Sequence, residues 1–183
     1  PEISYTESCG CHFLMSVDYR AVARRSIIEN ENRRLFEEKR VGLESRLSSA
    51  RDFEEIFREA GEYFKQLECD GITLVVDERL LALGDERDFP VRGYERGKLR
   101  VVYSDDAGKP GEYETFDSYW ERKENEPNND VWMFTPFHYR DRSIGFSILK
   151  NGKFLYDNPY FYDIQSLLNR VIWEMYQRRC YIE

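Results

Sequence analysis

The strongest strand pattern of the chain lies in its C-terminal third. Two runs rich in β-branched and aromatic residues, Val131–Tyr139 and Ser143–Leu149, flank the charged turn Arg140-Asp141-Arg142. Runs of this composition, bounded by turn formers, predict strands. Asn151-Gly152 is a strong hairpin dipeptide, so we expect the chain to return through Lys153–Tyr156. The pattern therefore predicts a three-stranded antiparallel meander.

Two segments have the spacing of helices that pack on a core. Asp52 and Glu55 have capping-box spacing, and they open a predicted helix over Phe53–Leu67 with its apolar residues on one face. A last helix is predicted from about Tyr160 to Arg179. Its apolar residues recur at i, i+3 and i+4, at Ile164, Leu167, Leu168, Val171, Ile172 and Met175.

The middle of the chain supplies the remaining elements. Ile72–Val76 is predicted as a buried strand and Leu99–Tyr103 as a second strand. Pro90–Gly97 is expected to be a loop and Phe116–Lys123 a short helix. The predicted fold class is α+β, with a central antiparallel sheet and the two core helices packed on one face.

A long helix is predicted over Val17–Ser49, which contains no proline and is rich in Glu and Arg. Its apolar residues make a narrow stripe, with Ala21, Ile28 and Leu35 at heptad spacing. A narrow stripe on a charged helix is typical of a two-stranded seam, so we expect a homodimer paired along this helix. The alternative is that the helix packs on its own domain.

Composition and charge limit the classes of function. Of 183 residues, 41% are hydrophobic and 15% aromatic, which is enough for a folded domain with a core. The formal net charge of −8 argues against direct nucleic-acid binding, because phosphate contacts need a positive surface. No run of 18 apolar residues occurs, so no membrane-spanning helix is expected.

The four cysteines, Cys9, Cys11, Cys69 and Cys180, do not form a disulfide framework, which favours a reducing, cytoplasmic location. Cys9-Gly10-Cys11-His12 has the form of half a metal site, but the sequence has no second Cys/His pair to complete it. We therefore expect no metal and no cofactor.

The strand–turn–strand segment resembles the C-terminal half of a GAF domain, a sensor module of bacterial signalling proteins. The matching residues are Phe134-Thr135-Pro136-Phe137, the turn Arg140-Asp141-Arg142, and the Ile144-Gly145-Phe146 step before a closing helix. The amino-acid sequence of this segment most resembles a GAF-like (PAS/GAF-type) subgroup found in multidomain regulators. In that subgroup a sugar-repressor-like ligand-binding domain precedes this part, and a diguanylate cyclase or an AraC-type DNA-binding domain often follows.

A second, weaker similarity to the subgroup is the segment Ser8-Cys9-Gly10-Cys11, which resembles the end of the repressor-like domain. The resemblance thus implies three parts: residues 1–16 as an irregular tail of a preceding domain, 17–49 as a signalling and dimerisation helix, and 50–183 as the GAF-like domain. It also implies that the chain is a piece of a larger protein.

The resemblance places a ligand pocket between the sheet and the segments that cross it, Pro90–Gly97 and Tyr113–Asp130. Aromatic residues concentrate there, and apolar walls with a few polar groups are typical of small-molecule sites. The candidates are Tyr94, Tyr113, Phe116, Trp120, Trp132, Phe134 and His138. Alternatively, the aromatic residues form a satellite core under a loop, and His138 is a structural histidine.

The implied function is a non-enzymatic sensory or transmitter module of a bacterial cytoplasmic signalling or transcription regulator. A signal would pass as a change in the relative rotation of paired helices. No nucleophile–base pair is recognisable, so no catalytic residue is expected. Two alternatives stay open: an enzyme that reduces free methionine sulfoxide through Cys69, and a purely structural dimerisation linker.

Overall fold

The computed structural model describes residues 4–8, 12–16, 19–65, 69–105, 113–125, 130–152 and 159–182. These residues belong to two compact units, Pro1–Gly42 and Leu43–Glu183. The second unit contains the sheet and the candidate site.

The first unit opens with a β-hairpin. β1 (Ser4–Ser8) pairs antiparallel with β2 (His12–Ser16), so that Ser4 lies opposite Ser16. The expectation of an irregular tail over residues 1–16 is therefore wrong for these ten residues. Strand formers stand on both sides of Gly10, but each run is too short to give a clear alternation.

The long helix α1 spans Tyr19–Ser49. The side chains of Ala21, Ile28 and Leu35 lie outside the part of the chain that is described, so the predicted seam stays a prediction. The end of α1 belongs to the second unit, where Leu43 is 0% and Leu47 1% exposed. Because these leucines are buried, the folded domain begins inside the helix and not at residue 50.

The second unit has an α+β fold with an open four-stranded sheet. Its strands are β3 (Gly71–Asp77), β4 (Leu99–Ser104), β5 (Trp132–Tyr139) and β6 (Arg142–Lys150). They lie in the order β4-β3-β6-β5, and every neighbouring pair is antiparallel. All four strands lie where the sequence predicts them; the further strand expected at Lys153–Tyr156 lies outside the described residues.

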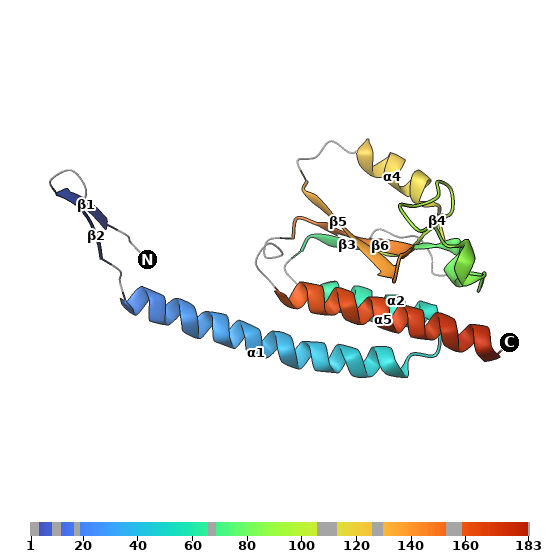
Figure 1. The fold of residues 1–183 in the computed structure, drawn as a ribbon, viewed down its shortest axis with the longest axis horizontal. Helices are drawn as coiled ribbons and strands as arrows, with labels where there is room; N and C mark the ends of the chain where they lie inside the picture. The colour runs from blue at the N-terminus through green and yellow to red at the C-terminus, as the bar shows by residue number, and fades with distance from the viewer. Residues whose placement is uncertain are drawn as a thin grey trace. The chain divides into compact units, whose positions relative to one another are not determined.

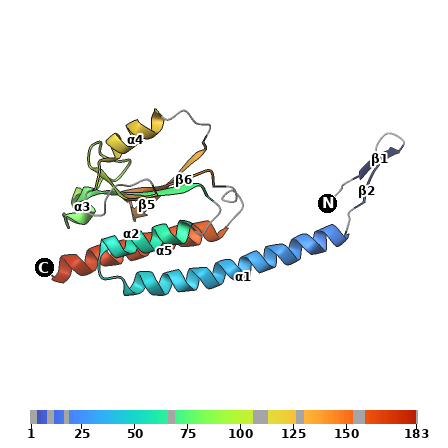
Figure 2. The same ribbon diagram turned by 180° about the vertical axis from the view of Figure 1, so that it is seen from behind.

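The helices cover both faces of the sheet. α2 (Phe53–Lys65) and α5 (Pro159–Ile182) lie on one face, as predicted, and α4 (Phe116–Glu124) lies on the other (Figures 1 and 2). The short α3 (Glu78–Leu81) follows β3 directly. The predicted cap of α2 is present, since the Asp52 carboxylate accepts from the Glu55 N–H at 2.9 Å.

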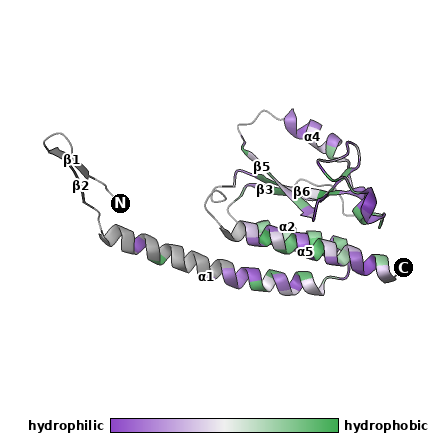
Figure 3. Cartoon of the chain, viewed as in Figure 1, coloured by the Kyte–Doolittle hydropathy of each residue, from purple (hydrophilic) through white to green (hydrophobic). Residues whose placement is uncertain are grey.

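The main core lies between the sheet and the pair α2 and α5, whose hydrophobic residues stand out in Figure 3. Its most deeply buried members come from α2, β3 and α5: Ile56, Ala60, Phe64, Ile72, Leu74, Val76, Ile164 and Leu168. Burying a side chain of this size stabilises the fold by about 1.5–3 kcal/mol.

Gly145 lets β3 and β6 approach each other closely. Its φ is +156°, and a Cβ at this position would lie 2.2 Å from the Val75 carbonyl oxygen and 2.8 Å from the Val76 Cα. No side chain fits there. The Ile-Gly step that carries the GAF resemblance therefore has a steric reason in this fold.

Candidate functional site

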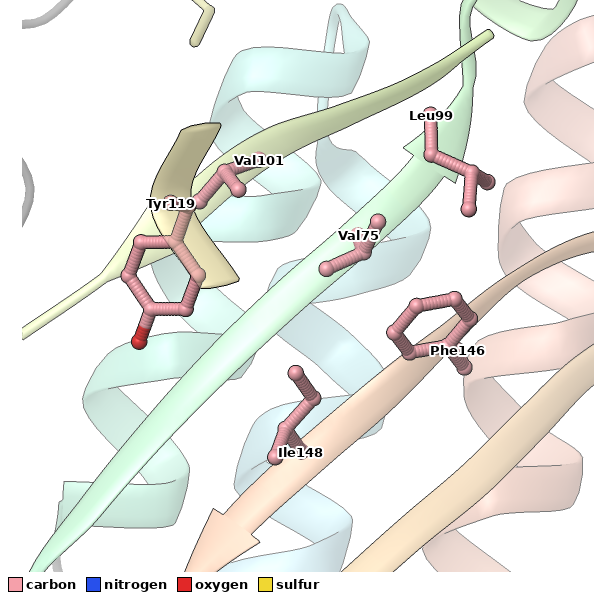
Figure 4. Packing of buried hydrophobic residues seen from close by; sticks show 6 residues of the cluster. All are labelled: Val75, Leu99, Val101, Tyr119, Phe146 and Ile148. Carbon is pink, nitrogen blue, oxygen red and sulfur yellow. The ribbon is translucent and has the colours of Figure 1, made fainter. Parts of the chain in front are cut away.

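The two faces of the sheet differ because strand side chains alternate. On β3, Ile72, Leu74 and Val76 face the main core. Thr73 and Val75 face α4, and in the sheet register they lie opposite Ile148 and Phe146 of β6. Figure 4 shows the resulting second cluster under α4, formed by Val75, Leu99, Val101, Tyr119, Phe146 and Ile148.

Aromatic rings cover this second cluster. Tyr94, Phe116, Trp120 and Trp132 pack against it while only partly buried. The Phe146 ring is central: the Tyr94 and Phe116 ring centroids each lie 5.1 Å from it in edge-on contact. Such contacts contribute about 0.5–1.5 kcal/mol each beyond the area they bury.

The rings continue from α4 onto the edge strand β5. Trp120 lies 5.7 Å from Trp132 and 5.4 Å from Phe134, measured between ring centroids, and Phe134 lies 5.9 Å from Phe146. Phe134 is 47% exposed although it belongs to this network. The aromatic face, which we define as Tyr94, Phe116, Trp120, Trp132, Phe134 and Phe146, is therefore closed at its centre and open along β5.

Hydrogen bonds hold the residues of the aromatic face in place against the sheet. The Tyr94 hydroxyl donates to the Gly145 carbonyl at 2.6 Å, and burial raises the pKa of Tyr94 to about 12. Thr73 Oγ1 and Tyr119 Oη share a hydrogen bond of 2.7 Å in the buried layer below. These bonds tie the loop that carries Tyr94 and the helix α4 to the sheet.

Five of the seven predicted pocket residues thus meet on one face: Tyr94, Phe116, Trp120, Trp132 and Phe134. Tyr113 does not pack on this cluster. Burial raises the pKa of Tyr113, with smaller contributions from the Glu54 and Asp52 carboxylates near the start of α2. The sequence placed Tyr113 with the other candidates because Tyr113 is close to Phe116 along the chain, but the two residues do not share a face.

His138 is also separate from the aromatic face. A register shift between Phe137 and His138 interrupts the pairing of β5 with β6. The His138 backbone N–H donates to Asn169 Oδ1 of α5 at 3.2 Å, and the side chain is exposed. Sequence reasoning could not foresee this placement, because a bulge changes which residues share a face.

A groove that the sequence pattern did not predict lies on the α5 side of β5, with a volume of about 490 Å³. His138 lines it together with Arg140 and with α5 residues that include Asn169, Arg170 and Trp173. The signal available in the sequence was the run of polar and charged residues at i, i+3 and i+4 on the face of α5 away from its apolar stripe.

Cys69 lacks the features of a reactive thiol. It is half-buried, its Sγ donates to the Phe64 carbonyl at 3.5 Å, and burial is the largest cause of a raised thiol pKa. The thiolate is the nucleophilic form, so a raised pKa lowers reactivity. Nothing in this geometry favours the reductase alternative.

Among the described residues, no group of three or more His, Cys, Asp or Glu side chains is arranged to hold a metal ion. In the same part of the chain, no helix combines the length and the apolar character needed to cross a membrane.

The chain matches no protein-family model, no curated protein and no solved structure in comparisons with each of these.

Proposed function

We propose that this chain is a GAF-like sensory and transmitter module of a larger bacterial regulator, in which the aromatic face receives a small, largely apolar ligand. The observation that carries the proposal is the half-open aromatic face on a four-stranded antiparallel sheet. Part-exposed rings with a single fixed hydroxyl, that of Tyr94, offer the apolar walls and sparse polar groups typical of ligand sites.

The Ile144-Gly145-Phe146 step links the family resemblance to this face. Gly145 allows β6 to lie against β3, and the next residue, Phe146, is the ring around which Tyr94, Phe116 and Phe134 gather. In the proposed module, Gly145 brings β6 against β3 and Phe146 lines the ligand face.

A route for signal transmission leads from the aromatic face to α5. Ser147 lies between Phe146 and Ile148 on β6 but faces the opposite side of the sheet. It accepts a hydrogen bond of 2.6 Å from Gln165 Nε2 of α5, and both residues are buried. A ligand that shifts β6 would therefore also shift α5.

α5 is in turn joined to the end of α1. Arg170 of α5 pairs with Glu44 at 2.7 Å, within the second unit. α1 also leaves apolar side chains exposed, with Ile27 at 59% and Val41 at 60%, two heptads apart. They lie one position before the predicted seam through Ile28 and Leu35, with the charged Arg34 at the heptad position between them, so they support pairing as residues that flank this seam.

The three tryptophans of the chain provide the test, because each gives one indole N–H signal in a ¹H–¹⁵N correlation spectrum. Trp120 and Trp132 report on the aromatic face and Trp173 on the opposite side of the sheet. Single Trp→Phe variants assign the signals. The probe is benzyl alcohol, a small neutral aromatic molecule.

We expect benzyl alcohol to shift the Trp120 and Trp132 signals in a saturable way and to leave Trp173 in place. A Phe134→Ala variant enlarges the open edge of the face and should change the apparent affinity. If neither Trp120 nor Trp132 responds at any probe concentration that the fold tolerates, the aromatic face is a closed satellite core and the ligand-sensing proposal fails.

A further inference from the structure

The groove beside α5 is lined by the end of β5, by the turn after it and by one face of the helix. It is on the opposite side of the sheet from the aromatic face, because Trp132 and Phe134 alternate away from the side that contacts α5. A volume of about 490 Å³ is within the range of small-molecule sites. The groove is therefore a second candidate site, independent of the proposed function.

The charge of the groove differs from that of the chain. The chain has a formal net charge of −8, yet the groove is lined by two guanidinium groups, Arg140 and Arg170, against one carboxylate, Glu174. Arg170 is paired with Glu44 at 2.7 Å. The Arg140 guanidinium carbon lies 5.1 Å from the centroid of the neighbouring Tyr139 ring. The charged guanidinium group therefore lies beside an aromatic surface.

An aromatic stack forms one wall of the groove. The Trp173 and Tyr139 rings are parallel, with centroids 4.0 Å apart and planes at 11°. Tyr176 and Phe89 hold Trp173 from other sides, at 4.8 Å and 6.4 Å between centroids. Trp173 is only 2% exposed, so this wall is rigid and needs no reordering when a ligand binds.

Two hydrogen-bond donors at the groove lack acceptors among the described residues. The Trp173 Nε1–H has none, and because this nitrogen is fully buried it senses a ligand in the groove without contacting it. The side-chain oxygen of Asn169 accepts a hydrogen bond from the His138 backbone N–H. This bond fixes the orientation of the amide, so that its –NH₂ group is the donor available to a ligand. An arginine and an amide N–H donor beside a flat wall together favour an oxyanion on a planar body.

We propose that this groove binds a small organic oxyanion, a carboxylate or a phosphate ester. The Arg140 guanidinium pairs with the oxyanion, Asn169 donates to it, and the body of the ligand lies against the Trp173–Tyr139 stack. Arginine binds both oxyanions through two parallel N–H···O bonds, so the two ligand classes share one chemistry.

The test uses benzoate and phenyl phosphate as probes with the full chain, at constant ionic strength. The readout is the Trp173 indole N–H signal, with benzyl alcohol as the neutral control. We expect a saturable shift of Trp173 with one or both anions and not with benzyl alcohol. A response to benzoate alone indicates a carboxylate ligand, and a response to phenyl phosphate alone indicates a phosphate ester.

Three variants make the test specific. Arg140→Gln removes the cation and should weaken binding about tenfold, since a charge-assisted hydrogen bond is lost. Asn169→Asp keeps the acceptor for the His138 N–H but replaces the amide donor by a negative charge, and it should weaken binding at least as much. Arg96→Gln changes a guanidinium that is 89% exposed and does not line the groove, so it should change nothing.

The proposal is overturned if neither anion shifts the Trp173 signal saturably, or if Arg140→Gln and Asn169→Asp bind the probes as tightly as Arg96→Gln. The Trp120 and Trp132 signals in the same spectra report the aromatic face. Failure of the groove and failure of the proposed sensory face are therefore seen separately.

Discussion

Gly145→Ala tests whether the close approach of β3 and β6 shapes the site. The new methyl group would meet the Val75 carbonyl oxygen at 2.2 Å and the Val76 Cα at 2.8 Å. Both neighbours are backbone atoms of the central strand, so neither can rotate away. The two strands must separate, and Phe146 and the Tyr94 hydroxyl bonded to the Gly145 carbonyl must move with them.

The expected loss in the free energy of unfolding of Gly145→Ala has two parts. Overpacking a tight interior costs about 1–3 kcal/mol, and an alanine at positive φ adds strain of order 1–3 kcal/mol. The sum, about 2–6 kcal/mol, is a large share of the roughly 5–15 kcal/mol by which domains are stable. Gly93→Ala is the matched control, since Gly93 has a φ of +68° but no atom within 4 Å of the place where a Cβ would lie, so only the strain applies.

Urea unfolding, followed by tryptophan fluorescence and far-ultraviolet circular dichroism, measures both variants in the full chain. All three tryptophans lie in the second unit, so the fluorescence reports its unfolding. We expect Gly145→Ala to lose at least about 1 kcal/mol more than Gly93→Ala. Equal losses would refute the steric argument and, with it, the structural reason given for the Ile-Gly step.

Three further predictions follow from single contacts. Asp77→Ala removes a fully buried carboxylate from its pair with the partly exposed Arg79, whose hydrogen bonds measure 2.7 and 2.6 Å, and should cost about 1.5–3 kcal/mol in urea unfolding, because Arg79 keeps its pair with Glu95; a loss below about 0.5 kcal/mol would contradict it. The pKa of Tyr94 is about 12 in the fold against 10.0 unfolded, so its contribution to stability is complete below pH 10 and is lost as the pH rises through 12; Tyr94→Phe should flatten the fall in stability over this window, and an unchanged slope would oppose the assignment. Ser147→Ala leaves the buried Gln165 amide without its partner and should cost roughly 1–3 kcal/mol, most of which Gln165→Met recovers in the double variant; additive losses in thermal unfolding would disprove the coupling.

The sequence predicted the elements of the fold well where hydrophobic periodicity was long and regular. α2, α5 and all four strands of the sheet lie where the apolar pattern placed them. The hairpin of β1 and β2 escaped notice because five-residue strands give little periodicity. The start of the second unit inside α1 was missed because burial of Leu43 depends on tertiary packing that a helical pattern does not reveal.

The candidate site was predicted in part for similar reasons. Trp120 and Trp132 do lie together, because α4 places Trp120 against the face of β5 that carries Trp132 and Phe134; that this face binds a ligand stays a prediction. The position of His138 depends on a bulge in β5, and bulges leave no reliable trace in composition. The groove at Trp173 combines residues from a turn and from one face of α5, so no contiguous sequence motif predicts it.

We propose that two protomers pair through α1 and that a signal is relayed along the paired helices. The most direct test of this proposal is the mass in solution, by light scattering, of the chain and of the Ile28→Asp/Leu35→Asp variant. Asn30→Asp/Asn32→Asp, which adds the same two charges within the polar run of α1, is the control. We expect twice the 22.0 kDa chain mass for the parent chain and the control, and 22.0 kDa for the seam variant. A parent chain of 22.0 kDa, or a seam variant that stays dimeric, would contradict transmission through a paired helix.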